Sequence, residues 1–356
     1  MHESVALFFL IFLHCLFSFA FSQSHHIQFD HIGTAEGLSQ SNVFCIMQDS
    51  CGFMWFGTWG DLNKYDGYMI TVYKNDPLDS NSISNNFITS ITESKNAGLW
   101  IATSGGGICR YNRNNEHFTR YRHDPKNVNS ICSDLVNTIL KDEQGKLWIG
   151  TEAGLDMFDP VKNKFEHFTY NPDDTISLSN LFVSYDFEDT HHDLWICTSN
   201  GLNLFNRESK TFTHFQHDKN NSKFIGGNIV STMFEDSKHR LWIGTVGARM
   251  DLFNKKTGIF LHFKHHENTT NTLPFNVVAN INEDADNNLW IATRNGGLSI
   301  FNYTAGIFTT CKNDKVDKES ISHNSLNSIY KDSKNNMWVG NFASMSPQIK
   351  ISAKKF

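Results

Sequence analysis

The side chains with the clearest binding chemistry follow a recurring Trp-Ile-Gly-Thr motif, at places where the sequence stops repeating. An aromatic ring there can stack on a sugar ring, and an arginine fork can pair with an acidic sugar. The candidates for ligand binding are Trp59, Glu152, Asn200, Arg249, Arg294 and Asn295. Trp59 is the one Trp of eight that stands outside the motif. The alternative is that all six are solvated loop residues.

Carboxylates recur six residues before the motif's Trp, and this repetition argues against catalysis. A catalytic site needs a convergent nucleophile, base and charge stabiliser, and it occurs once. An Asp repeated in every unit is typical of a turn. These residues are Asp49, Asp142, Asp189, Asp236, Asp284 and Asp332, with Ser94 in the same place in the second unit. We therefore assign no catalytic residue, and a glycan-cleaving enzyme stays the alternative.

Histidines and cysteines show no metal-binding pattern. The pairs His191-His192 and His265-His266 have no carboxylate at a clear spacing, and the chain has no Cys-x-x-Cys motif. Four other histidines recur beside paired aromatics and are expected to face solvent: His117, His167, His214 and His262. We expect no metal and no cofactor.

The elements that must position these residues are set by the Trp motif, which occurs seven times. The seven residues are Trp55, Trp100, Trp148, Trp195, Trp242, Trp290 and Trp338, at intervals of 45, 48, 47, 47, 48 and 48. An aliphatic residue stands twelve before each Trp, and a Gly and an aromatic follow it. Within a unit, apolar and polar residues alternate with period two, which predicts short strands.

Each unit predicts four strands, and seven such units are typical of a β-propeller. We predict an all-β, seven-bladed β-propeller of four-stranded antiparallel blades. The run 27–32 resembles a stray fourth strand and is expected to complete the last blade, because an open ring would leave edges exposed. The pattern fails after Gly340, so the last blade is expected to be atypical or truncated. Gly, Ala or Cys after the Trp dyad fits a close approach of the neighbouring blade.

Composition and the N-terminus indicate an exported protein. The 356 residues carry a formal charge of −6 without basic runs, which is untypical of nucleic-acid binders. Residues 5–21 are almost entirely apolar. The run ends in the small-x-small site Ala20-Phe21-Ser22, and a polar stretch follows. We predict a signal peptide at 1–22, although its first residues lack Lys and Arg, and a propeller at 23–356. The alternative is an uncleaved anchor; otherwise no run has membrane length.

The opening of the repeat array resembles a known family. Residues 37–43 (Gly-Leu-Ser-Gln-Ser-Asn-Val), 48–58 (through Trp55-Phe56-Gly57-Thr58) and 62–67 are similar to the two-component regulator propeller family, and the likeness covers about residues 27–341. The resemblance implies a periplasmic sensor of a hybrid two-component histidine kinase that responds to oligosaccharides. The kinase would then reside in a C-terminal part outside this sequence.

The functional prediction is a periplasmic ligand-sensing propeller that is not itself an enzyme. Its expected partners are an oligosaccharide or other small ligand and a possible second copy of the chain, but neither nucleic acid nor membrane. The alternatives are a stand-alone exported propeller that binds or cleaves glycans, or a non-functional truncated remnant.

Overall fold

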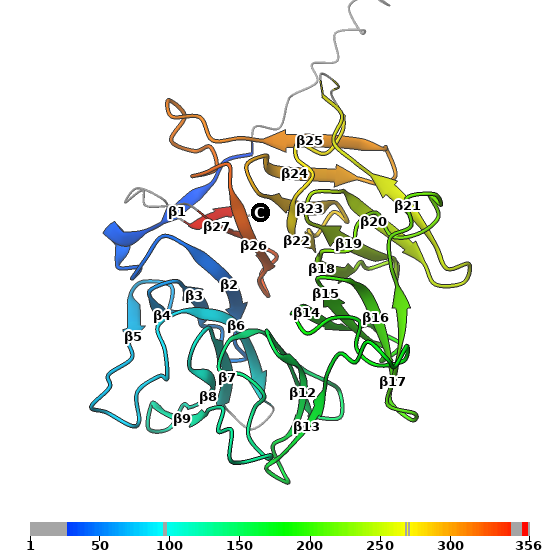
Figure 1. Cartoon of the computed structure of the whole chain (residues 1–356). Coiled ribbons are helices and arrows are strands. Elements are labelled where there is room, and N and C mark those ends of the chain that lie inside the picture. The colour runs from blue at the N-terminus through cyan, green and yellow to red at the C-terminus, as the bar shows by residue number, and fades with distance from the viewer. Residues whose placement is uncertain (1–26, 95–97, 268, 270, 343–350, 355–356) are drawn as a thin grey trace, which may run out of the picture.

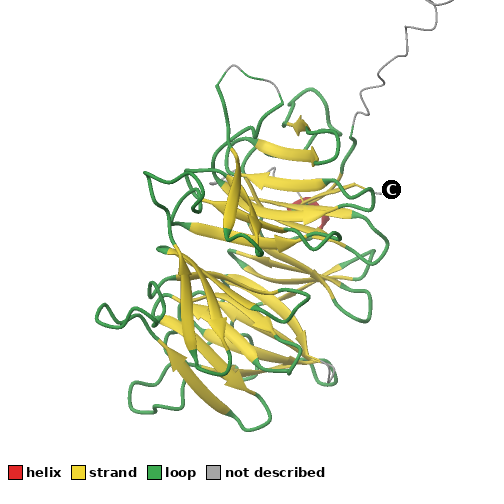
Figure 2. Ribbon diagram, turned by 90° about the vertical axis from the view of Figure 1, so that its right-hand side faces the viewer, coloured by secondary structure: helices red, strands yellow, loops and turns green. Residues whose placement is uncertain are grey.

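Each Trp-Ile-Gly-Thr motif lies on the second strand of a four-stranded antiparallel sheet, and the sheets form a ring around a central channel (Figure 1). The computed structural model describes residues 27–94, 98–267, 269, 271–342 and 351–354. Strands make up nearly all of its regular structure, with loops at both faces of the ring (Figure 2). Within this described part, no helix is long and apolar enough to cross a membrane.

Six blades are each built from four consecutive strands. Blade 1 is β2 (Val43–Gln48), β3 (Met54–Thr58), β4 (Asp61–Tyr65) and β5 (Ile70–Tyr73); blade 2 is β6 (Ile88–Ser94), β7 (Gly98–Thr103), β8 (Gly107–Asn112) and β9 (His117–Tyr121). Blade 3 is β10 (Val136–Lys141), β11 (Leu147–Thr151), β12 (Gly154–Asp159) and β13 (Lys164–Phe168); blade 4 is β14 (Val183–Glu188), β15 (Leu194–Thr198), β16 (Gly201–Asn206) and β17 (Thr211–Phe215). Blade 5 is β18 (Val230–Glu235), β19 (Leu241–Thr245), β20 (Met250–Asn254) and β21 (Ile259–Phe263); blade 6 is β22 (Val278–Glu283), β23 (Leu289–Thr293), β24 (Gly297–Asn302) and β25 (Ile307–Cys311).

The prediction of a seven-bladed propeller needs a correction in how the ring is built. Only six blades are continuous; a composite sheet in the order β1-β28-β27-β26 closes the ring. It joins β26 (Leu326–Lys331) and β27 (Met337–Asn341) to β28 (Ile351–Lys354) and the N-terminal β1 (Asp30–Ile32). The physical reason is that the Gly-Leu step that opens the third strand in blades 3, 4 and 6 is missing after Asn341. The third strand of this sheet is β28, which begins only after residues 343–350; those residues lie outside the described part.

The N-terminal strand is shorter than expected but holds the expected place. β1 pairs antiparallel with β28, with His31 opposite Ser352. Before it, Phe29 is buried against Trp290, with ring centroids 6.3 Å apart. A short 3-10 helix, η1 (Thr34–Glu36), follows β1. The predicted signal peptide at 1–22 lies outside the described residues, so it stays a prediction.

The repeated Asp forms the same clasp in six of the seven sheets. In blade 6, one oxygen of Asp284 accepts the backbone N–H groups of Asp286 and Asn288, both at 2.9 Å. The other oxygen accepts the indole N–H of Trp290 at 2.9 Å. The same indole bond, 2.8–3.0 Å long, ties Asp49, Asp142, Asp189, Asp236 and Asp332 to their own Trp residues. In each of these six sheets the carboxylate lies in the turn between the first and second strands.

Each clasped Trp packs against the next sheet and joins the ring together. Trp148 of blade 3 lies in a cluster with Val183, Ile196 and Phe205 of blade 4, and Trp338 packs in the same way on blade 1. The small residue after the Trp dyad makes this approach possible. A Cβ on Gly150 would lie 2.5 Å from Thr138 of its own blade and 2.5 Å from Val183 of the next.

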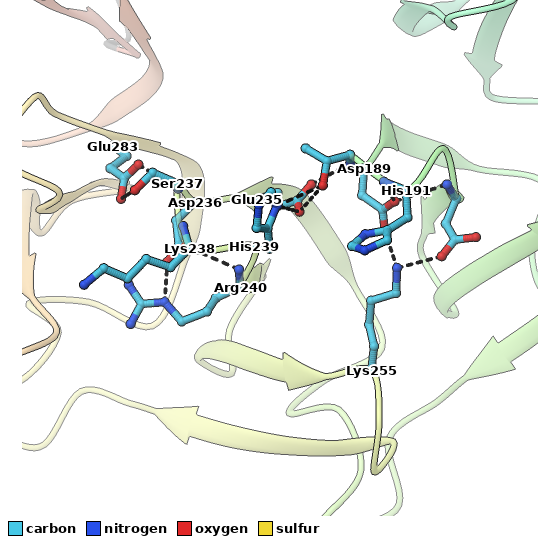
Figure 3. A network of polar contacts seen from close by, with 12 residues as sticks. Asp189, His191, Glu235, Asp236, Ser237, Lys238, His239, Arg240, Lys255 and Glu283 are labelled. Carbon is cyan, nitrogen blue, oxygen red and sulfur yellow. Dashed lines mark hydrogen bonds and ion pairs between the residues drawn. The ribbon is translucent and has the colours of Figure 1, made fainter.

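Two rings of hydrogen bonds also link neighbouring blades. Along the channel wall, polar side chains bind the first strand of the next blade, as when Asn137 donates to the Val183 carbonyl at 2.8 Å. On the face that carries the Asp turns, which we call the turn face, the amide after the Asp donates to a first-strand carboxylate of the next blade in blades 1, 3, 4 and 5. Figure 3 shows this tie between Ser237 and Glu283, 2.8 Å long. Lys255 of blade 5 reaches Asp189 of blade 4 beside it, at 2.7 Å.

Two of the four recurring histidines, the exposed His167 and the half-buried His262, also contact a buried carboxylate. His167 Nδ1 lies 2.6 Å from the fully buried Asp156, and His262 Nδ1 lies 2.7 Å from the fully buried Asp251. The opposite ring nitrogen of each bonds to a backbone carbonyl of Val128 or Ser222. The hydrogen bond to Asp156 raises the pKa of His167 to about 9. His117 is exposed, as predicted.

Asp186 is a buried carboxylic acid where the other six sheets have an aliphatic residue or Met. Its Oδ1 accepts the Thr138 hydroxyl at 2.5 Å, whereas Oδ2 is buried without a hydrogen-bond partner among the described residues. Burial in this apolar layer raises the pKa of Asp186 to about 7. In the equivalent place of blade 5 stands Met233, which is 1% exposed.

Removing a clasp should destabilise the ring because it leaves a buried indole N–H without an acceptor. We expect Asp284→Ala to lower the free energy of unfolding by about 3 kcal/mol and Asp284→Asn, which keeps one acceptor, by about 1 kcal/mol. Urea denaturation measures both. The matched control is Asp286→Ala, an exposed residue of the same turn, which should stay within about 0.5 kcal/mol of the wild type. Equal losses for Asp284→Ala and the control would contradict the clasp.

The pair of His167 and Asp156 should stabilise the fold only while the imidazole is charged. The folded pKa of His167, about 9, lies above its ordinary 6.5. The contribution is therefore complete below about pH 6.5 and is lost as the pH rises through about 9. A histidine NMR titration should show this. The comparison variant is Asp156→Asn, which the fold should accept because Asn203 stands in the same place of blade 4 and accepts a backbone amide there. In this variant the pKa of His167 should be lower than in the wild type. An unchanged titration of His167 would contradict the pairing.

Replacing Asp186 should stabilise the protein most at alkaline pH. Its folded pKa, about 7, lies above the ordinary 3.8, so the proton is held more tightly in the folded state. The resulting loss of stability develops from about pH 4 and is complete above pH 7. Asp186→Ile should therefore raise the unfolding midpoint more at about pH 8 than at about pH 5. An equal gain at both values would show that Asp186 does not titrate between them.

Candidate functional site

The loops between second and third strands surround one opening of the channel, on the face opposite the Asp turns. We call this the mouth face. A buried Thr ends the second strand in the six continuous blades and fixes the loop that follows. In blade 3 the Thr151 hydroxyl donates to the Gly154 carbonyl and accepts the Ala153 amide, both at 2.9 Å. The residue directly after Thr151 is thereby held at the rim of the channel.

One position of this loop has the same backbone contact in all seven sheets. Its N–H donates to the carbonyl of the residue just before the first strand's leading aliphatic, as when Arg294 donates to the Val277 carbonyl at 3.0 Å. The side chains at this position differ from sheet to sheet. We call them the mouth ring: Trp59, Ser104, Glu152, Ser199, Val246, Arg294 and Phe342. The fold therefore fixes where these residues lie but not which residues they are.

Four aromatic rings form a continuous arc along one side of the mouth. Trp59 stacks on Phe87 with ring centroids 5.7 Å apart. Phe87 lies 4.6 Å from Phe44, and Phe44 lies 5.8 Å from Phe342. Trp59 is 53% exposed, whereas the other seven Trp residues are at most 7% exposed. The aromatic arc thus spans blade 2, blade 1 and the composite sheet, and one of its ends is open to solvent.

A cation lies at the other end of the arc. The guanidinium carbon of Arg294 lies 4.1 Å from the Phe342 ring centroid, and Nη2 donates to Asn327 Oδ1 at 2.8 Å. Burial lowers the pKa of Arg294. Both Arg294 and Glu152 line the channel, whose volume is about 790 Å³. That volume is large enough for a small ligand.

The structure places the six predicted site residues in two groups. Trp59, Glu152 and Arg294 surround the mouth of the channel. Asn200 instead holds its own loop in place, because its side-chain amide donates to the Ser179 carbonyl at 3.2 Å. The Arg249 side chain lies against Gly226, and Asn295 is an exposed turn residue with φ +76°. Neither Asn200, Arg249 nor Asn295 lines the channel. The role of all six in binding stays a prediction.

Phe44, Phe87 and Phe342 were not predicted to lie at the site, although the sequence carries a signal for Phe44. At the position of Phe44, the other sheets carry Thr89, Asn137, Ser184, Ser231, Ala279 and Asn327. All of these except Ala279 bind the next sheet, for example Ser231 to the Val278 carbonyl at 2.5 Å. A Phe in this position gives up that bond and puts an aromatic ring in the channel.

No group of three or more His, Cys, Asp or Glu residues in the described ranges is arranged to hold a metal ion. Cys109 and Cys197 are free thiols. The chemistry that the mouth offers is therefore stacking, hydrogen bonding and pairing with an anion.

Comparison with known proteins relates the repeats to a family. The sequence model described as "Two component regulator propeller" matches residues 37–60, 127–153, 224–247, 272–295 and 320–343. A 63-residue stretch is 44% identical to histidine kinase P4 of Formosa agariphila, covering 18% of this chain and 5% of that protein.

Solved structures show the same ring. The extracellular domain of a protein assigned as a hybrid two component system of B. thetaiotaomicron is 28% identical, with a TM-score of 0.77, over 92% of this chain and 42% of that one. Virginiamycin B lyase from Staphylococcus aureus has a TM-score of 0.67 at 14% identity, which shows a common fold alone. This chain thus spans less than half the length of that extracellular domain. Five segments of its repeats match the model of the two component regulator propeller family, and the repeats are similar to that family.

Proposed function

We propose that the chain is the ligand-binding ring of a periplasmic sensor and that an oligosaccharide binds at the channel mouth. The likeness to extracellular domains of two-component systems supports a role outside the cytoplasm. A ligand that binds across several blades would affect how they sit against each other. That change would pass to a kinase in another part of the protein, and the 63-residue likeness to a histidine kinase supports this arrangement.

The observation that carries this proposal is the mouth ring. Residues that build the fold repeat in nearly every sheet: the clasp Asp, the Trp and the Thr. The mouth ring has an equally regular backbone, yet its side chains include an indole, two hydroxyls, a carboxylate, a guanidinium and two other apolar groups. Residues that the fold does not require and that surround one opening are typical of a recognition surface.

The aromatic arc favours a sugar over other small ligands. Sugar rings have apolar faces that stack on aromatic side chains and hydroxyls that need hydrogen-bond partners. The exposed indole of Trp59 offers such a face, and Phe87, behind it, holds the ring in place. Arg294, Glu152 and Ser104 supply donors and acceptors along the channel.

Binding at the mouth should shield Trp59, the one exposed Trp among the eight. Iodide should quench mainly this indole in the free protein. We expect an oligosaccharide that raises the melting temperature to reduce that quenching as well, because a ligand bound only by the folded state stabilises it. The probes are hexasaccharides of glucose, xylose and galacturonic acid and a carrageenan oligosaccharide. Chromatography of the same mixtures detects cleavage.

Trp59→Ala should weaken binding by about tenfold, since one stacked ring is lost. The matched control is Tyr68→Ala, another aromatic of blade 1, which is 94% exposed in the turn between β4 and β5. It should bind like the wild type. Stabilisation by a probe with no change in Trp59 quenching would place the site elsewhere. No stabilisation by any probe would speak against the oligosaccharide.

A further inference from the structure

Arg294 lines the channel and, unlike the cations beside the clasp Asp residues, has no carboxylate partner among the described residues. Arg113 pairs with Asp49 and Glu93 at 3.0 and 2.6 Å. Arg207 pairs with Asp142 and Glu188 at 2.9 and 2.8 Å. Lys255 and Arg240 are paired in the same way. Arg294 contacts only a neutral amide oxygen and a phenyl ring. Its positive charge is thus partly buried and not neutralised.

The guanidinium is nevertheless held in one place. Its backbone is fixed by the mouth-ring bond to Val277, and its side chain crosses to the composite sheet, where Asn327 and Phe342 hold it. Asn327 is itself bound to the Phe44 carbonyl at 3.1 Å. Such a group has already lost rotamer freedom and water before a ligand arrives. The loss of water makes an unpaired charge costly, and an incoming anion would offset that cost.

We propose that the channel mouth recognises an anionic saccharide, with Arg294 binding its carboxylate or sulfate group and the aromatic arc carrying the sugar rings beside it. This inference rests on the proposed function. Guanidinium has five N–H donors in a planar fork, and only one is used by Asn327. The fork fits two oxygens of a carboxylate or a sulfate ester.

The second charge at the mouth, the carboxylate of Glu152, sets the orientation in which the saccharide binds. Glu152 is exposed on blade 3, three sheets away from Arg294 on blade 6. An anionic group is repelled near Glu152 and attracted near Arg294. The aromatic arc starts beside Arg294, at Phe342, and runs through Phe44 and Phe87 to Trp59. The acidic group therefore binds at blade 6, and the neighbouring sugar rings extend over the composite sheet towards blades 1 and 2.

The test uses the full chain and three sugars of one size: glucose, glucuronate and glucose 6-sulfate. Arginine-selective ¹⁵N labelling reports on the Arg294 side-chain N–H, which is assigned from its absence in Arg294→Lys. We expect a saturable shift with glucuronate or glucose 6-sulfate below about 100 mM, a range that covers millimolar dissociation constants. Glucose should bind at least about tenfold more weakly. The stronger of the two anions identifies a uronate or a sulfate ester as the natural group.

Variants separate recognition of the anion from a purely structural role. Arg294→Gln should lose about tenfold to a hundredfold in affinity for the anion, and Arg294→Lys, which keeps the charge without the fork, should fall between. Arg110→Gln, an exposed arginine of β8, is the control and should bind like the wild type. If Arg294→Gln does not fold, the test rests on Arg294→Lys. Anion binding by Arg294→Lys as strong as that of the wild type would contradict recognition by the guanidinium fork.

Three results would overturn the inference: no saturable shift with either anion, an equal shift with glucose, or undiminished anion binding by Arg294→Gln. The proposed function fails differently. If neutral oligosaccharides protect Trp59 while neither anion reaches Arg294, the mouth binds sugars but not through their acidic groups. If anions bind Arg294 but no oligosaccharide protects Trp59, the arc is not a sugar platform.

Discussion

The ring depends on one interaction: a buried Asp that accepts the indole N–H of the Trp six residues later. The clasp satisfies a polar group that would otherwise be costly to bury, and it fixes the indole so that its other atoms can pack on the next sheet. The clasp is the same in six sheets, so each of these sheets presents its Trp to the next sheet in the same way. The hydrogen bonds along the channel and across the turn face add to this contact.

A scaffold held by repeated residues leaves other positions free to vary. The mouth ring shows this most clearly, since seven identical backbone contacts present Trp59, Arg294, Glu152 and their neighbours around one opening. The departures from the repeat gather there: Phe44 replaces a residue that links sheets, and Arg294 brings a charge without a counter-charge. Asp186 is a departure elsewhere, between blades 3 and 4, where its burial costs stability at neutral pH.

The sequence predicts well whatever a single repeat decides. The recurrence of Asp142 at a fixed spacing from Trp148 indicates a turn residue, although not its bond to the indole. The alternation from Val136 to Phe168 indicates the four strands. The composite sheet was harder, because β28 follows no repeat pattern and pairs with β1 from the other end of the chain. The aromatic arc joins Phe44 to Phe342, nearly three hundred residues apart, and no local pattern reveals that contact. His167 is exposed as expected, but its contact with Asp156 could not be predicted because Asp156 lies on the neighbouring strand.

The central claim is that repeated residues make the fold and the mouth ring makes the recognition. The most direct measurement is the stability and the binding of one variant in which Trp59, Glu152 and Arg294 are all Ser, the residue that stands naturally at 104 and 199. The account predicts an unfolding free energy within about 1 kcal/mol of the wild type and no detectable saccharide binding. A variant that unfolds, or one that still binds as the wild type does, would contradict it.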